Sequence, residues 1–132
     1  MMELTSICKL KILPQYVFRN TSPAIFGVRI EGGKLISGLN LIDENNEKVG
    51  KVKNIQSENK KVEESAEGKE VAISVPGVNF ERQLEVGQNL YTNLSETEFR
   101  KFKEHKSLLS PEEKSLLQEI AEIKRKDNVT WG

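Results

Sequence analysis

Residues 22–41 read SPAIFGVRIEGGKLISGLNL, and the spacing of the apolar residues in this segment indicates the fold class of the chain. Every second residue in its first half is apolar, which is the spacing of a β-strand that buries one face. The residues on that apolar face are Ala24, Phe26, Val28 and Ile30. The next glycines, Gly32 and Gly33, can take the positive φ angles of a tight hairpin turn. The stretch therefore predicts the central hairpin of a small β-barrel.

Short extended segments recur on both sides of this hairpin. The alternation of apolar and polar residues predicts strands over residues 7–13, 39–41, 48–55, 70–75 and 90–92. Pro14 should end the first of these strands because proline has no N–H to donate, and Gly50 should mark a bulge or a close approach. Residues 57–61 have the composition of a polar hairpin tip, and residues 63–68 that of an acidic loop. Short strands separated by turns, without helices between them, indicate a barrel or a sandwich.

The apolar spacing changes from two residues to three or four at Ser95. Residues 95–98 (SETE) and 110–113 (SPEE) both have the form of a capping box, in which a serine and a glutamate satisfy each other's free amides at a helix start. We expect helices over residues 95–106 and 110–126. The chain is therefore predicted to consist of a β-barrel over residues 1–94 and a two-helix extension over residues 95–132.

Composition restricts the chemistry that the chain can perform. Its 132 residues include 20 basic and 20 acidic side chains, so charge alone does not favour nucleic acid. One cysteine and one histidine provide neither an internal disulfide nor a cysteine–histidine metal site. Gly50-Lys51 and Gly68-Lys69 each resemble half of a phosphate-binding loop, but neither has the upstream glycine or the following Ser or Thr. These observations favour a binding module over an enzyme, and we predict no catalytic residue, metal ligand or membrane span.

Two surfaces are candidates for binding. A small barrel can hold a single-stranded end in a shallow pocket on its strand edges, with a rim here formed by residues 27–29, 57–61 and 69–71. The alternative is that these are ordinary strand and loop residues. The apolar helix residues Phe99, Phe102, Leu116 and Ile120 are expected to be core contacts between helices and barrel, or else a groove for a partner peptide.

Several segments resemble a known family. Residues 10–18 read LKILPQYVF, residues 27–33 read GVRIEGG, and VKNI, EVAI, Asn79-Phe80 and Leu90-Tyr91 follow in order at residues 52–55, 70–73, 79–80 and 90–91. This series is similar to the last domain of translation initiation factor five-B, the archaeal and eukaryotic homologue of bacterial initiation factor two. The resemblance extends from about Cys8 to the end of the chain.

The resemblance implies a fold and a set of partners. The fold is mainly β, a closed β-barrel of the elongation-factor second-domain type followed by two C-terminal α-helices. The whole factor is a ribosome-bound GTPase that uses GTP and magnesium and helps the ribosomal subunits to join. This chain lacks the GTPase domain, so we expect a cytoplasmic, monomeric fragment of a longer protein, with no cofactor of its own.

The same resemblance assigns partners to the two candidate surfaces. The barrel would contact the aminoacyl end of initiator methionyl-tRNA, and the helices would help to bind the tail of initiation factor one-A. The candidate tRNA contacts are Gly27, Val28, Arg29, Ser57, Asn59, Lys60, Lys61 and Glu70.

Two questions about these contacts stay open at the level of sequence. The hairpin tip has no aromatic residue, so hydrogen bonds from Ser57 and Asn59 and the charge of Lys60 or Lys61 are more plausible there than base stacking. On the neighbouring strand, either Val28 or the alternating Gly27 and Arg29 face outward. An alternative function is a stand-alone β-barrel adaptor that binds only a protein partner.

Overall fold

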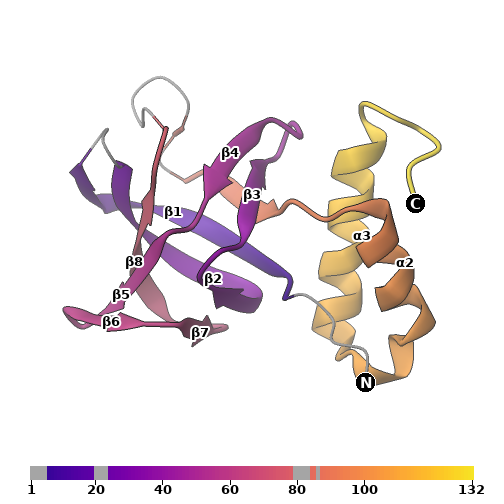
Figure 1. Ribbon diagram of the computed structural model, residues 1–132, viewed down its shortest axis with the longest axis horizontal. Helices are drawn as coiled ribbons and strands as arrows, with labels where there is room; N and C mark the ends of the chain where they lie inside the picture. Colours follow the sequence, from indigo (N-terminus) through magenta and orange to yellow (C-terminus); the bar gives the residue numbers. More distant parts are fainter. Residues whose placement is uncertain (1–5, 20–23, 79–83, 86) are drawn as a thin grey trace.

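A computed structural model describes residues 6–19, 24–78, 84–85 and 87–132, with the backbone alone for residues 14–19. Within these residues, nine strands form one curled sheet, and two α-helices stand side by side against one end of it (Figure 1). The strands are β1 (Cys8–Arg19), β2 (Ala24–Ile36), β3 (Asn40–Asp43), β4 (Lys48–Lys51), β5 (Asn54–Ser57), β6 (Lys60–Val62), β7 (Glu64–Ala66), β8 (Glu70–Val75) and β9 (Asn89–Thr92). The helices are α2 (Glu96–Glu104), the short 3-10 helix η1 (Lys106–Leu108) and α3 (Pro111–Arg125). The mainly β fold with two C-terminal helices is as predicted.

The sheet curls into a barrel through its hydrogen-bonded order, which is β4-β3-β9-β1-β2-β8-β5-β6, with β7 added to β2. The segment between β4 and β5 joins the two ends of this order. Val52 exchanges backbone hydrogen bonds with Gly38 and Leu39 just before β3, and the Lys53 amide donates to the Ser74 carbonyl of β8 at 2.9 Å. The segment of residues 52–53 thus connects the two ends of the curled sheet, although β4 and β5 do not pair with each other in the described part of the chain.

Strand β2 differs from its sequence prediction. Gly32 and Gly33 form no hairpin turn, because they lie inside one continuous strand opposite Lys9 and Cys8 of β1. Gly33 has φ +73°, and a Cβ on it would lie 2.0 Å from the Ile7 carbonyl oxygen. The glycine pair therefore bends β2, whose first part pairs with β1 and β8 while its last three residues pair with β7.

Three further expectations about strands were wrong. The predicted single strand over residues 48–55 is two strands, β4 and β5, which residues 52 and 53 separate and which lie far apart in the sheet order. Pro14 does not end β1, which continues to Arg19 across an irregular register between Ile12 and Val17, where a missing N–H is tolerated. The acidic segment 63–68 is not all loop, because residues 64–66 form β7 against the end of β2. Residues 79–83 and the side chains of residues 14–19, which contribute to the family resemblance, lie outside the described part.

Alternation along the strands buries one face of the sheet as predicted. The barrel core contains Cys8, Leu10, Ile12, Ala24, Phe26, Val28, Ile30, Leu35, Leu39, Leu41, Val49, Val52, Ile55, Val71, Ile73, Val75, Val78, Leu84 and Leu90. Gly50 approaches this core closely, since a Cβ on it would lie 2.7 Å from Val75 Cγ1.

A second cluster, the helix-side core, joins the helices to the sheet. It contains Ile7, Ile42, Tyr91, Leu94, Phe99, Phe102, Leu109, Leu116, Leu117, Ile120, Ala121, Ile123 and Trp131. Both capping boxes form as predicted, at Ser95 with Glu98 and at Ser110 with Glu113, and they fix where each amphipathic helix begins. The apolar face of each helix then packs against the barrel, because that contact removes both surfaces from water.

Polar contacts surround this apolar junction. Lys9 Nζ of β1 lies 3.0 Å from Glu119 Oε1 of α3, and the Lys126 ammonium donates to the Glu44 carbonyl at 2.9 Å. Burial alone would lower the pKa of Lys9, but its contacts with Glu119 and Tyr91 outweigh burial and raise that pKa. The ammonium of Lys9 is therefore held in its charged form where barrel and helix meet.

Candidate functional site

The outer face of the barrel carries an open groove of about 500 Å³ beside the β5–β6 hairpin, which we call the outer-face groove. Its lining residues are Leu13, Ile25, Gly27, Gln56, Glu58, Asn59, Glu70, Val71 and Ala72. Gly27 of β2 and Ala72 of β8 are direct cross-strand partners, and Gln56 of β5 is the next partner along the row. Because side chains alternate between the two faces of a sheet, these three residues point away from the barrel core. Two very small neighbours thus leave a hollow between Leu13 and Ile25 on one side and the hairpin on the other.

The β5–β6 hairpin presents its tip to this groove. Ser57 pairs with Lys60, so the turn consists of Glu58 and Asn59, which have φ +52° and +66°. Positive φ at both central positions is the geometry of a type I′ turn, whose twist matches that of its two strands. The turn places the Glu58 carboxylate and the Asn59 amide at the edge of the groove.

Among the described side chains that line the groove, the charged ones, Glu58 and Glu70, are both acidic. Glu70 is paired with Arg29 on the neighbouring strand: Arg29 Nε and Nη2 lie 3.2 and 3.0 Å from the same oxygen, Oε2. Glu58 is exposed, and within the described part of the chain no basic side chain pairs with it. The groove therefore has an apolar floor, two amide side chains and an acidic edge.

The predicted tRNA contacts separate into three groups. Gly27, Asn59 and Glu70 line the outer-face groove, and Arg29 lies at its rim through its pair with Glu70. Val28 faces the other way, with its side chain fully buried in the barrel core. Of the two faces that the sequence left open, the outward one is thus that of Gly27 and Arg29.

The remaining predicted contacts belong to the hairpin beside the groove. Lys61 is the cross-strand partner of Gln56, so it continues the outward row of Gly27 and Ala72. Lys60 is exposed, and Ser57 is half-buried opposite it. These three side chains are outside the lining of the groove but border it.

Sequence reasoning missed four lining residues: Leu13, Ile25, Gln56 and Ala72. The outward direction of Ala72 could be read from its place between buried Val71 and Ile73. Its position beside Gly27 could not, because that neighbourhood depends on strand register across 45 residues of chain.

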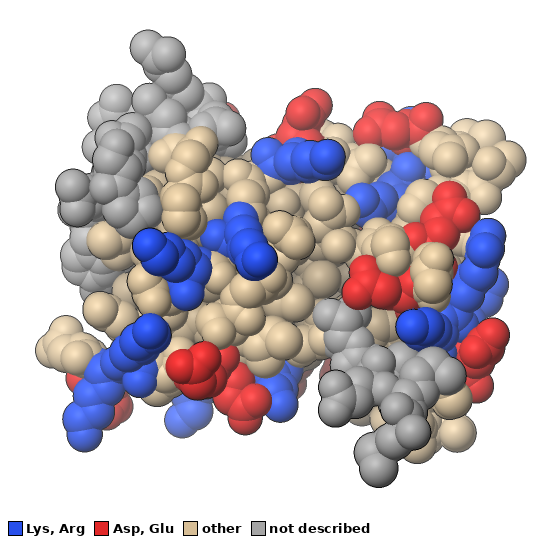
Figure 2. All heavy atoms as spheres, in the orientation of Figure 1, with Lys and Arg blue, Asp and Glu red and all other residues tan. Residues whose placement is uncertain are grey.

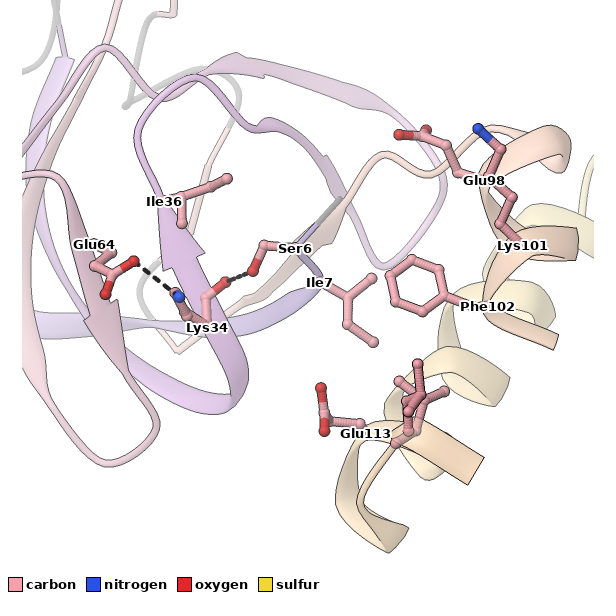
Figure 3. A pocket seen from close by; sticks show the side chains of 11 residues that line it. Ser6, Ile7, Lys34, Ile36, Glu64, Glu98, Lys101, Phe102 and Glu113 are labelled. Carbon is pink, nitrogen blue, oxygen red and sulfur yellow. Dashed lines mark hydrogen bonds and ion pairs between the residues drawn. The ribbon is translucent and has the colours of Figure 1, made fainter. Parts of the chain in front are cut away.

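A second hollow lies where the barrel meets the helices. This barrel–helix cleft, of about 960 Å³, is lined by Ser6, Ile7, Lys34, Ile36, Glu64, Glu98, Lys101, Phe102, Leu108, Leu109 and Glu113. Figure 3 shows Phe102 of α2 pointing toward Ile7. On the barrel side, Lys34 Nζ lies 2.8 Å from Glu64 Oε2, and Ser6 Oγ donates to the Lys34 carbonyl at 2.6 Å (Figure 3). Apolar side chains are thus interspersed with charges of both signs.

The four residues expected either as core or as a peptide groove are all buried. Phe99, Leu116 and Ile120 belong to the helix-side core, and Phe102 belongs to it as well as to the lining of the cleft. Trp131 covers Phe99, with ring centroids 4.9 Å apart. The accessible apolar group beside Phe102 is instead Leu108 of η1, which is 72% exposed.

The other residues considered for chemistry have structural positions. Burial raises the pKa of the Cys8 thiol to about 12, although a hydrogen bond from Thr92 acts in the opposite direction, so Cys8 is a protonated core residue. Gly50-Lys51 lies inside β4 and Gly68-Lys69 in the turn before β8, so neither pair starts a helix as a phosphate-binding loop does. Among the described residues, no cluster of His, Cys, Asp and Glu side chains could hold a metal ion.

The molecular surface agrees with the neutral composition. Figure 2 shows basic and acidic side chains interspersed over the face in view. None of the helices in the described ranges has the length and apolarity needed to cross a membrane.

Comparisons with known proteins support one family. Residues 7–91 match the family described as elongation factor Tu domain 4. The chain is 42% identical over 131 residues to a probable translation initiation factor IF-2 of Methanoculleus marisnigri, covering 98% of this chain and 22% of that protein. A protein of the same description from Methanopyrus kandleri is 41% identical, with the same coverage of 98% and 22%.

A solved structure agrees with these relatives. GDP-bound aIF5B from Aeropyrum pernix superimposes with a TM-score of 0.89 at 36% identity, over 94% of this chain and 21% of that one. The chain thus spans about a fifth of the length of the proteins that it matches. It belongs to the elongation factor Tu domain 4 family and corresponds to one domain of a translation initiation factor of the archaeal IF-2/aIF5B kind.

Proposed function

We propose that this domain is a binding module of a ribosome-bound initiation factor, and that its outer-face groove receives the aminoacyl end of initiator methionyl-tRNA. The observation that carries the proposal is the hollow over Gly27 and Ala72, which adjoins most of the contacts expected for that end. A further part of the proposal is that the barrel–helix cleft receives the tail of initiation factor one-A.

The shape and chemistry of the groove support an aminoacyl end as its ligand. Its volume of about 500 Å³ is within the range of about 300–1,000 Å³ typical of small-ligand pockets. Leu13, Ile25 and Ala72 offer apolar contact to a methionine side chain, and the amides of Gln56 and Asn59 can bond to ester, ribose or base atoms. A mostly apolar groove with a few polar groups selects the end of a strand rather than its phosphates.

Basic residues beside the groove suit the RNA backbone that would lead to this end. Lys61 points outward on the same face as Gln56, and Lys60 is its exposed neighbour on the hairpin. Since cationic side chains favour phosphate and the described lining residues of the groove include none, the backbone would pass over β6 before the terminal nucleotide enters the groove.

The cleft suits an extended or helical peptide. Leu108, which is 72% exposed, supplies apolar contact, and Lys101 can pair with an acidic residue of a tail. The cleft and the outer-face groove have no described lining residue in common, so both ligands could bind at once.

GTP hydrolysis, in this proposal, belongs to another part of a longer protein. The domains that account for the remaining four fifths or so of the relatives' length would hold GTP and magnesium. The residues of this chain would act by binding alone, in the cytoplasm and as part of a monomeric factor.

The tRNA proposal is tested by titrating the domain with methionyl initiator tRNA and with the same tRNA after deacylation. We expect the aminoacylated form to bind more tightly. Equal affinities for the two forms would contradict a role in reading the aminoacyl end.

The cleft proposal is tested with a synthetic peptide of the factor one-A tail. We expect Leu108→Ser to weaken peptide binding and to leave tRNA binding unchanged, because Leu108 lies in the cleft and is exposed. Peptide binding without any tRNA binding would favour the protein-only adaptor instead.

A further inference from the structure

The outer-face groove has an unusual charge for a site that would take the end of an RNA chain. Among the described residues of its lining, the two charged ones, Glu58 and Glu70, are acidic, and a carboxylate repels phosphate. The group that approaches these carboxylates should therefore be neutral or positive.

An aminoacyl ester carries such a group. Its α-amino nitrogen is protonated at about pH 6, well below the usual pKa of an α-amino group, and the resulting ammonium has three N–H donors. Within an aminoacylated 3′ end it is the only cation, because the ribose, the base and the methionine side chain are uncharged. Carboxylates that accept charge-assisted hydrogen bonds are its natural partners.

The two carboxylates are held in different ways. Glu70 is oriented by Arg29, whose Nε and Nη2 both bind Oε2, and this pair neutralises part of its charge. Glu58 has no basic partner within the described residues. The tight turn that it forms with Asn59, in which both residues have positive φ, fixes the position of its Cβ. Glu58 is therefore the stronger candidate to attract a cation, and Glu70 is the candidate to orient it.

We propose that Glu58 and Glu70 bind the α-ammonium group of the methionyl ester, so that the groove selects a free aminoacyl end over an N-acylated one. This inference rests on the proposed function and adds the chemical group that the groove recognises. It makes Glu58 a specificity-determining residue and leaves the apolar floor at Gly27 and Ala72 to hold the methionine side chain.

The experiment compares three ligands of the 132-residue chain at about pH 6: deacylated, methionyl and N-acetylmethionyl initiator tRNA. Acetylation removes the positive charge of the amino group while keeping the methionine. We expect acetylation to weaken binding to the unaltered domain by up to about fivefold, the upper end of the effect of one exposed ion pair. Glu58→Gln should remove this difference, and Glu70→Gln should reduce it.

Glu104→Gln is the matched control, since Glu104 is an exposed carboxylate of α2 outside the groove, and it should keep the difference that acetylation makes. If methionyl-tRNA binds better than deacylated tRNA but acetylation has no effect, the proposed function stands and this inference is overturned. An acetylation effect that persists in both glutamine variants would also overturn it. If aminoacylation itself has no effect, the proposed function fails and this inference fails with it.

Discussion

Two patches on the outer face of the same sheet differ in whether the chain covers them. At β3 and β9, the cross-strand partners Ile42 and Tyr91 are large, and the chain's own helices cover them. At β2 and β8, the partners Gly27 and Ala72 are small, and an open groove remains above them. Large apolar residues on an outer face require a cover, whereas small residues leave room for a ligand.

The contrast separates residues that stabilise the fold from residues that are free to bind. Substitutions in the helix-side core should change the free energy of unfolding and affect binding only through it. Substitutions in the outer-face groove should weaken binding and leave the free energy of unfolding nearly unchanged. Four sets of variants test this separation, in order of decreasing effect.

The helix-side core should give the largest effect. Phe102 is 3% exposed, so Phe102→Ala should lower the free energy of unfolding by about 3–5 kcal/mol through reduced burial and a residual cavity. Urea denaturation measures this decrease. The control is Leu108→Ala, four residues beyond α2 and 72% exposed, which should change stability by less than about 0.5 kcal/mol. Similar decreases in the two variants would contradict the assignment of Phe102 to a filled core.

The bend in β2 should give the second-largest effect. It lies between the part of that strand that lines the groove and the part that lines the cleft. Gly33→Ala forces a side chain into positive φ and against the Ile7 carbonyl, and should cost more than about 2 kcal/mol. Gly68→Ala separates the two causes, since Gly68 has φ +88° and nothing within 4 Å of an added Cβ. It should cost only about 1 kcal/mol of backbone strain. Thermal unfolding of both variants measures these costs. Equal decreases in melting temperature would mean that the structure relieves the clash at Ile7 at little cost.

Substitutions in the groove should affect binding more than stability. Ala72→Leu fills the hollow beside Gly27, so binding of methionyl initiator tRNA should fall at least about tenfold while stability changes by less than about 1.5 kcal/mol. Fluorescence anisotropy and urea unfolding give the two values. Ala66→Leu on the exposed face of β7 is the matched control and should leave binding intact. Unimpaired binding by Ala72→Leu would remove the groove from the interface.

The hairpin should give the smallest effect. Lys60→Glu and Lys61→Glu should each weaken tRNA binding a few-fold, because both lysines are exposed and border the groove without lining it. The slope of log K against log salt should decrease by about 0.7 for each single-strand phosphate that a lysine no longer neutralises. Lys106→Glu, on the exposed surface of η1, is a control of equal charge change. A salt slope unchanged from that of the unaltered domain would show that neither lysine binds a phosphate.

Local patterns in the sequence predicted much of this fold. The alternation at residues 24–30 and the serine–glutamate pairs at Ser95 and Ser110 correspond directly to β2, α2 and α3. Such patterns depend on residues two to four apart, so the chain displays them without reference to its tertiary structure.

Features that depend on distant partners escaped prediction. Gly32 and Gly33 are equally compatible with a turn and with a bend in a strand, and only the approach of Ile7 and Cys8 decides between them. The groove likewise arises from register, which sets Gly27 beside Ala72. Which of residues 27–29 face outward became clear only from the barrel core, which contains Val28.

Mapping of backbone amide shifts tests most directly whether the hollow over Gly27 and Ala72 holds the aminoacyl end. Isotope-labelled domain is titrated with methionyl initiator tRNA and, separately, with deacylated tRNA. We expect the shifts specific to the aminoacylated ligand to centre on Gly27, Asn59 and Ala72 and to spare Ile120 of the helix-side core. Shifts centred instead on the barrel–helix cleft, around Ile7 and Leu108, would contradict a role of this hollow in binding the aminoacyl end.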